Sequence, residues 1–164
     1  MPILSLDAID MRILSALQWN GRLSNVDLAV EVGLSPSPCL RRVRLLEEGG
    51  YISGYRAMLG RESLGLGLTV FVGIKVERHD DESASALENK IDSMPEVVAC
   101  HLVSGESDYL LEVVVPDLVS YERFLRNTLL KLPMVRDITS NFAIHRVKSE
   151  SPLPLTHLVK SAGA

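Results

Sequence analysis

Three arginines lie close together in the stretch SPSPCLRRVRLL, which covers residues 35–46. A guanidinium group offers a planar fork of donors that matches phosphate oxygens and the N7 and O6 acceptors of guanine. Two serines and two prolines precede these arginines, and proline is tolerated in the first turn of a helix. The stretch therefore predicts a helix that begins near the prolines and carries basic side chains close to its start.

A helical projection separates an apolar side of this stretch from a basic side. At about 100° per residue, one arc holds three apolar residues: Cys39, Val43 and Leu46. Arg41 points almost directly away from that arc, with Ser37 and Arg44 beside it, and Arg42 lies on the flank. A recognition helix presents such hydroxyl and basic groups to base edges and phosphates in the DNA major groove.

The two prolines leave two starts open for this helix. If Ser35 is the N-cap and Pro36 the first helical residue, Ser37 must adopt helical angles just before a proline, which is disfavoured. If Ser37 is the N-cap and Pro38 comes first, that conflict disappears. We therefore expect the helix to begin at Pro38.

Two shorter helical patterns precede this stretch. Residues 6–21 repeat apolar side chains at helical spacing and end on Asn-Gly, a common C-terminal stop. Residues 24–33 begin with Ser24 and end at Gly33. Asp27 follows Ser24 by three positions, which gives the Ser-x-x-Asp pattern of a capping box. Three short helices with a glycine turn before the third predict a helix-turn-helix. The candidate DNA contacts are Ser24, Asn25, Ser35, Ser37, Pro38, Arg41, Arg42 and Arg44.

The charge of the chain is divided unevenly between its two halves. The net charge of the 164 residues is −4, which by itself argues against a nucleic-acid partner. Residues 1–60 hold six basic and six acidic residues, however, whereas residues 61–164 hold eleven basic and fifteen acidic ones. An arginine cluster alone is more often an ordinary solvated surface, but the helices in front of this one favour a DNA-binding face.

The composition excludes several other classes of protein. No apolar run approaches the roughly 20 residues of a membrane-spanning helix, and the N-terminus lacks the layout of a signal peptide, so we expect a cytoplasmic protein. Cys39 and Cys100 are far apart and form neither a disulfide framework nor a metal-binding pair. The acidic run RHDDE at residues 78–82 is the start of a helix rather than a metal cluster. We expect no catalytic residue, metal or cofactor.

The second half of the chain repeats one pattern twice. Two strand-like runs flank a helical stretch that ends at Pro95, and two more flank a helical stretch that ends at Pro133. The runs cover residues 68–77, 97–105, 108–115 and 135–147. This order predicts a ferredoxin-like βαββαβ domain and hence an α+β fold. Because several strands are apolar on both sides, the open face of the sheet is expected to pack against a second copy, which gives a homodimer.

The residues from Leu6 to Leu59 resemble the DNA-binding half of the Lrp/AsnC, or feast/famine, transcriptional regulators, above all in GLSPSPCLRRVRLLE. The similarity continues through LVSGESDYLLEV and LLKLPMVRDI, to about residue 148. It implies a winged-helix-like DNA-binding domain and a strand and hinge at about residues 51–59. It also implies a C-terminal domain that binds amino acids and assembles dimers into a larger ring, expected to be an octamer.

The loop SGESDY at residues 104–109 has two interpretations. Glycine and aspartate are ordinary turn formers, so the bare sequence indicates a plain hairpin turn. In the resembled family, the glycine of this loop lets backbone amides approach a carboxylate and the aspartate offers a counter-charge to an ammonium group. The resemblance thus implies that Gly105 and Asp108 bind the effector, with three neighbours in the pocket: Val103, Ser104 and Tyr109.

These patterns divide the chain into a DNA-binding domain (1–50), a strand and hinge linker (51–67), an effector-binding and oligomerisation domain (68–148) and a tail (149–164) that is either a flexible end or an interaction strip. We expect a nucleoid-associated regulator that binds double-stranded DNA sequence-specifically. It is expected to respond to leucine or another apolar amino acid by changing its oligomeric assembly. One alternative is an architectural DNA-compacting protein of the same fold without an effector. Another is an enzyme of amino-acid metabolism, for which the sequence offers no catalytic motif.

Overall fold

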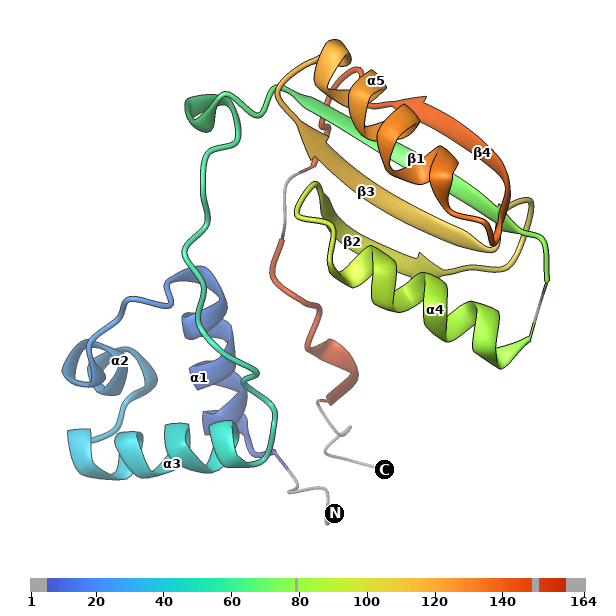
Figure 1. Cartoon of the computed structure of the whole chain (residues 1–164). Helices are drawn as coiled ribbons and strands as arrows, with labels where there is room; N and C mark the ends of the chain where they lie inside the picture. Colours follow the sequence, from blue (N-terminus) through green and yellow to red (C-terminus); the bar gives the residue numbers. More distant parts are fainter. Residues whose placement is uncertain (1–5, 79, 149–150, 159–164) are drawn as a thin grey trace. The chain divides into compact units, whose positions relative to one another are not determined.

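The computed structural model describes residues 6–78, 80–148 and 151–158. The chain divides into two compact units. One unit combines Met1–Met58 with Lys148–Ala164, and the other is Leu59–Val147. Figure 1 shows helices in the first unit and a sheet with two long helices in the second. Each unit is described by itself below.

The first unit contains the three helices that the sequence predicts: α1 (Ala8–Trp19), α2 (Asn25–Val32) and α3 (Pro36–Glu48). The capping box occurs at α1 rather than at α2, because Asp7 and Asp10 exchange side-chain and backbone hydrogen bonds. Ser24 does cap α2, since its hydroxyl accepts a hydrogen bond from Asp27 N–H. Gly33 ends α2 with a φ of 75°, a left-handed conformation that glycine adopts without steric cost.

Helix α3 begins at Pro36, so the prediction of a start at Pro38 is wrong. Ser35 is the N-cap, and its carbonyl accepts the first helical hydrogen bond from Cys39 N–H at 3.2 Å. Both prolines fit because the first-turn positions that they occupy lack intrahelical acceptors in any helix. Pro38 also removes the amide that an N-cap side chain usually binds, and the Ser35 hydroxyl makes no cap hydrogen bond.

The three helices enclose a small apolar core, and the tail adds to it. Cys39 is completely buried in this core, as its angular position predicts. Residues 151–158 run against α1: Leu153 N–H donates to Gln18 Oε1 at 2.6 Å, Gln18 Nε2 donates to the Leu153 carbonyl at 3.4 Å, and Leu155 packs against the core. The fully or nearly fully buried core residues are Ile13, Leu14, Ala16, Leu28, Ala29, Val32, Cys39 and Leu46.

Residues 51–67 form no strand within the single chain, so the strand expected in the linker stays a prediction. A strand requires a hydrogen-bonded neighbour, and no segment of the described chain pairs with residues 51–59. The backbone amides of Tyr51 and Ile52 instead donate to the Leu46 carbonyl and close the end of α3. The one regular element in this linker is a 3₁₀ turn, η1 (Glu62–Leu64).

The second unit has the predicted α+β order. Its elements are β1 (Leu68–Val76), α4 (Asp81–Asp92), β2 (Val97–Leu102), β3 (Tyr109–Val115), α5 (Leu118–Asn127), η2 (Leu129–Lys131) and β4 (Val135–Phe142). The strands form one antiparallel sheet in the order β2-β3-β1-β4, and both helices lie on the same face of it (Figure 1). The second helical stretch is shorter than predicted, because the α-helix ends at Asn127 and the chain continues only as the turn η2.

The sheet has one covered face and one open face. Along β1, Val70, Val72 and Ile74 are completely buried beneath the helices, whereas Phe71 between them is 39% exposed. Directly opposite Phe71 on β3, Glu112 binds Arg61 at 2.8 Å and lies 3.5 Å from Arg146. The open face therefore combines the apolar side chains that the sequence predicts with a charged cluster that it did not reveal. The remaining apolar residues of this face on β3 are Leu110 and Val114.

Candidate DNA-reading helix and effector loop

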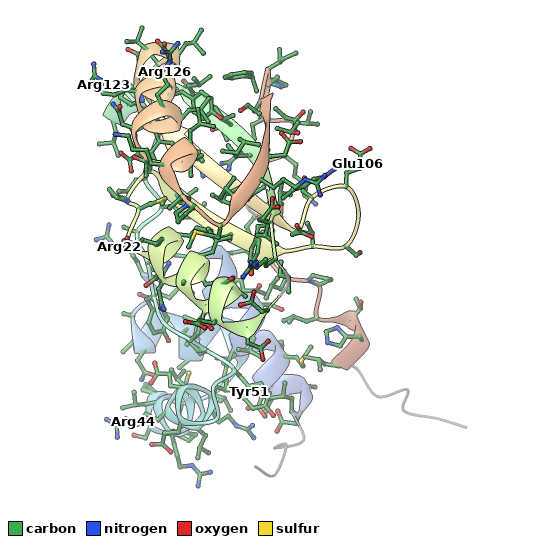
Figure 2. The ribbon with its side chains drawn as sticks, turned by 45° about the vertical axis from the view of Figure 1, so that its right-hand side comes forward. Arg22, Arg44, Tyr51, Glu106, Arg123 and Arg126 are labelled. Carbon is green, nitrogen blue, oxygen red and sulfur yellow. The ribbon has the colours of Figure 1, made fainter. Side chains whose placement is uncertain are left out.

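The outward side of α3 carries the basic groups that the sequence predicts there. Arg41, Arg44 and Ser37 are all exposed. Figure 2 shows Arg44 on the outside of the helical unit. None of the ion pairs within the described residues engages Arg41 or Arg44. These two guanidinium groups can therefore meet phosphate or base acceptors without first breaking an ion pair.

The first turn of α3 adds polar groups to the same side. Ser35, Ser37 and Pro38 are exposed, and the Ser35 hydroxyl makes no cap hydrogen bond. A helix N-terminus carries a partial positive charge from its unsatisfied amides, which favours a phosphate. We call the exposed residues of this turn, together with the two arginines, the α3 tip (Ser35, Ser37, Pro38, Arg41 and Arg44).

Arg42 is held away from the α3 tip. Its Nη1 atom lies 2.7 Å from a carboxylate oxygen of Asp7 and 2.7 Å from one of Asp10, both at the start of α1. The pKa of Asp7 is lowered, first by the hydrogen bond from Asp10 N–H and then by Arg42. The pKa of Arg42 is raised, mainly by its hydrogen bonds to the two acids. Sequence inspection missed Asp7 and Asp10, although their Asp-x-x-Asp spacing is that of a capping box.

Ser24 and Asn25 also have partners within the protein. The Ser24 hydroxyl donates to Asp27 Oδ2 at 2.6 Å and accepts from Asp27 N–H at 3.2 Å. Asn25 Nδ2 donates to the carbonyl of Pro36 at 2.9 Å, which links the first residue of α2 to the first residue of α3. Both side chains therefore stabilise helix starts, so their role as direct DNA contacts stays a prediction.

The predicted effector loop is the connection between β2 and β3. Asp108 is anchored within the sheet, because its Oδ2 accepts from Val76 N–H at 2.8 Å and its own N–H donates to the Ile74 carbonyl at 2.9 Å. The Asp108 carbonyl accepts from Val103 N–H at 2.9 Å, which closes the loop. Gly105 has a φ of 134°, and a Cβ there would meet nothing within 4 Å. The structure thus brings Val103, Ser104, Gly105 and Asp108 into one exposed or half-exposed turn.

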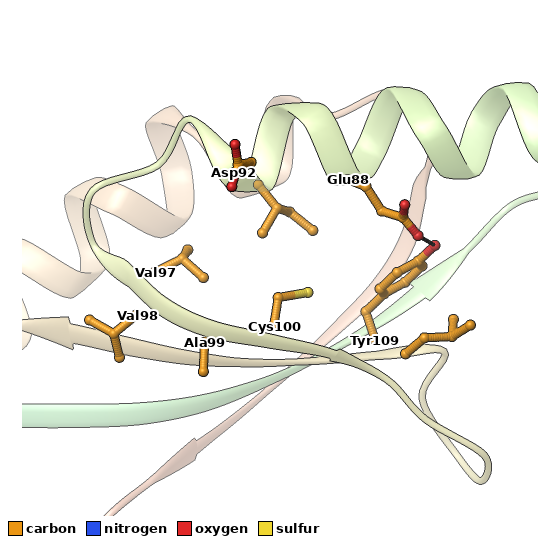
Figure 3. A pocket seen from close by; sticks show the side chains of 9 residues that line it. Glu88, Asp92, Val97, Val98, Ala99, Cys100 and Tyr109 are labelled. Carbon is orange, nitrogen blue, oxygen red and sulfur yellow. Dashed lines mark hydrogen bonds between the residues drawn. The ribbon is translucent and has the colours of Figure 1, made fainter. Parts of the chain in front are cut away.

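Tyr109 lies apart from this turn, on the covered side of the sheet. It is 3% exposed, and its hydroxyl donates to Glu88 Oε1 of α4 at 3.0 Å. Burial and the bond to Glu88 raise the pKa of Tyr109 to about 12. Figure 3 shows both residues in a pocket of about 360 Å³ between α4 and β2, next to Cys100. Tyr109 therefore supports the base of the loop, and Glu88 is a contact that the sequence did not reveal.

No helix in the described part of the chain is long and apolar enough to cross a membrane. Among the same residues, no group of three His, Cys, Asp or Glu side chains is placed to hold a metal ion. Cys39 and Cys100 are both free thiols. Cys39 is buried and Cys100 is exposed, but partial loss of hydration around each sulfur raises the pKa of both thiols, with Glu88 adding to the shift at Cys100, so the neutral thiol is favoured.

A helical unit with an exposed basic third helix, followed by a sheet domain with a polar hairpin loop, is the architecture of a DNA-binding regulator with a separate sensing domain. Residues 6–53 match the model of winged helix-turn-helix DNA-binding domains. Residues 69–153 match the model of the Lrp/AsnC ligand binding domain. The chain belongs to the Lrp/AsnC family of transcriptional regulators, which are DNA-binding proteins and not enzymes.

Curated relatives and solved structures agree with this assignment. The chain is 45% identical to the leucine-responsive regulatory protein of Haemophilus influenzae over 151 residues, which cover 92% of this chain and 91% of that protein. Identity to the Escherichia coli K12 protein of the same name is also 45%, over 90% of both chains. A Neisseria meningitidis transcriptional regulator in complex with L-Met superposes with a TM-score of 0.90 at 40% identity, covering 94% of this chain and 99% of that one.

Proposed function

We propose that this regulator reads a specific DNA site with the α3 tip and changes its assembly when its loop binds an apolar amino acid, leucine or methionine. The observation that carries the DNA half is the exposure of Arg41 and Arg44 without intramolecular ion pairs in the described residues. Arg41 meets a base edge, while Arg44 and the serine hydroxyls meet phosphates. A cytoplasmic, nucleoid-associated protein fits this activity.

The geometry of the β2–β3 loop supports amino-acid binding. Gly105 is exposed and has no Cβ to keep a ligand carboxylate from its backbone amide, and the Asp108 carboxylate, held by Val76 N–H, carries a charge that can attract an ammonium group. Val103 and Ser104 form the neighbouring wall, and Tyr109 fixes the end of β3 through Glu88. The relative solved with L-Met, together with those named leucine-responsive, favours an apolar amino acid as the effector.

The open face of the sheet supports a homodimer, and dimers of this kind build a larger ring such as an octamer. Phe71 and its apolar neighbours would lose contact with water when a second copy covers them. A dimer carries two α3 tips, which suits DNA half-sites spaced by a helical turn or a multiple of it. An effector that favours one assembly then shifts which arrangement of DNA sites is bound.

The effector half is tested by thermal denaturation of the full chain with each of the twenty amino acids. At about 100 times its Kd, a ligand adds about 2.7 kcal/mol to the free energy of unfolding, so leucine or methionine should raise the melting temperature. Asp108→Asn keeps an oxygen for Val76 N–H but removes the charge. Without ligand, this variant should have the melting temperature of the wild type. With ligand, its melting temperature should not rise.

The architectural alternative predicts a different outcome. A DNA-compacting protein would bind arbitrary DNA in a strongly salt-dependent way, without preference for a site and without an amino-acid effect. We define the selected site as the DNA sequence that the wild-type protein selects from a pool of random sequences. Equal affinity for the selected site and for arbitrary DNA, with no amino acid raising the melting temperature, would reject the sensor in favour of the architectural protein.

A further inference from the structure

Three charged side chains join the start of α1 to the middle of α3. Arg42 Nη1 bonds to Asp7 Oδ2 and to Asp10 Oδ1, each at 2.7 Å. The capping box of α1 holds both acids, because Asp7 accepts from Asp10 N–H at 2.9 Å and Asp10 accepts from Asp7 N–H at 3.1 Å. The guanidinium is therefore fixed by two carboxylates that are themselves fixed to the end of a helix. We call these three residues the α1–α3 clamp.

The charges of the clamp disfavour contact with phosphate. One guanidinium faces two carboxylates, which gives a formal charge of −1. The side chains of Arg42 and Asp10 are only 27% and 16% exposed, so water screens their attraction less than on an open surface. If Arg42 turned to a phosphate, Asp10 would be left partly buried without its cation, and an unpaired buried charge is costly.

The clamp lies where it can set the rotation of α3. The apolar side of this helix packs through Cys39 and Leu46, and apolar contacts have little directionality. Two charge-assisted hydrogen bonds, by contrast, fix both distance and direction. Arg41 and Arg42 are neighbours about 100° apart around the helix. If the clamp were lost and α3 rotated about its axis, Arg41 would therefore turn away from its outward position.

A second polar contact holds the start of α3. Asn25 Nδ2 donates to the Pro36 carbonyl at the first residue of α3, and the buried Asn25 Oδ1 atom has no hydrogen-bond partner among the residues that the structure describes. This side chain is turned into the protein, where it binds backbone. Helix α3 is thus held by polar contacts at its first residue and, through Arg42, in its middle.

We propose that Arg42 is a positioning residue, which holds α3 through Asp7 and Asp10 at the rotation that brings Arg41 and Ser37 to the bases and makes no phosphate contact itself. The inference rests on the proposed reading of DNA by the α3 tip. It reverses the direction in which removal of the Asp10 charge is expected to change the affinity for DNA. Removing a negative charge from a DNA-binding domain ordinarily strengthens DNA binding, whereas removing it here loosens the clamp.

The decisive variant is therefore Asp10→Asn in the full chain, measured on the selected site. Asparagine keeps an acceptor for the Asp7 amide but weakens the bond to Arg42. A positioning role predicts binding weaker by about 10-fold, the cost of a displaced base contact. A phosphate-binding Arg42 would instead be released by the change, and binding would become tighter. Glu31→Gln, at an exposed position of α2, removes the same charge outside the clamp and should leave binding unchanged or tighten it less than about 2-fold.

The salt dependence of binding gives an independent readout that holds if Asp10→Asn fails to fold. Each phosphate contact contributes about 0.9 to the slope of log affinity against log salt. Arg42→Gln and Arg42→Lys should both lose affinity for the selected site with an unchanged slope, whereas Arg44→Ala should lower the slope by about 1. Melting temperatures establish which variants are folded. A tighter Asp10→Asn complex, or a smaller slope for Arg42→Gln, overturns the inference, whereas a wild type that prefers no DNA site overturns the proposed function instead.

Discussion

Arg41 and Arg42 are adjacent and carry the same charge, but their surroundings differ. Arg41 is exposed on the α3 tip, while Arg42 is bound to two carboxylates of α1. A helical projection placed Arg41 outward correctly because that direction depends on α3 alone. It left Arg42 on the flank, since its partners lie more than thirty residues earlier in the chain. At this scale, the sequence determines which face a side chain occupies but not which distant group it meets.

Arg41→Ala should weaken binding to the selected site by about 1 to 3 kcal/mol and relax the preference for one base pair, because a bidentate contact to a base is lost. Fluorescence anisotropy with the selected site and with single-base variants of it measures both effects. Arg123→Ala, at an exposed arginine of α5 in the other unit (Figure 2), is the control. Equal losses for the selected site and for arbitrary DNA would show that Arg41 contacts phosphate and reads no base.

The start of α3 is a helix boundary that the sequence predicted wrongly. The 3.6-residue period identified all three helices of the first unit, because each buries one apolar side against the others. The choice between Pro36 and Pro38 depended on a local cost at Ser37, which tertiary contacts at Pro36, including the bond from Asn25, offset. The strand expected in the linker stays a prediction, since pairing needs a neighbour that the local sequence does not specify.

The cap of α1 gives a prediction about stability and pH. Asp7→Ala should lower the free energy of unfolding by about 1 kcal/mol at neutral pH, because two helix amides lose their acceptor. The folded-state pKa of Asp7 is lowered, so its contribution is complete above the unfolded pKa of 3.8 and is lost as the pH falls through the folded value. Urea denaturation should therefore show a gap between wild type and variant that shrinks below pH 3.8. A gap that stays constant down to pH 3 would contradict this linkage.

For the whole chain, the sequence predicted the order of the elements and left open whether the tail is a flexible end or an interaction strip. The βαββαβ order followed from two repeats of strand and helix patterns, each ended by a proline. Nothing local marks residues 151–158 as a strip that docks on α1, because Gln18 and Leu153 are ordinary surface residues until they meet. The assignment of residues 103–108 as an effector loop rests mainly on resemblance and stays a prediction, since the composition of this loop is that of any hairpin turn.

The open face of the sheet gives the prediction for assembly. If the open face forms the proposed homodimer, Phe71→Asp should convert it to a monomer at micromolar concentration, because burying a new carboxylate against a second copy is unfavourable. Light scattering coupled to size-exclusion chromatography measures the mass. Leu118→Asp changes another exposed apolar residue, at the start of α5 on the covered side of the sheet, and should keep the wild-type mass. Loss of the dimer should also weaken binding to the selected site, since a monomer presents one α3 tip instead of two. A Phe71→Asp protein with the wild-type mass would place the dimer interface elsewhere.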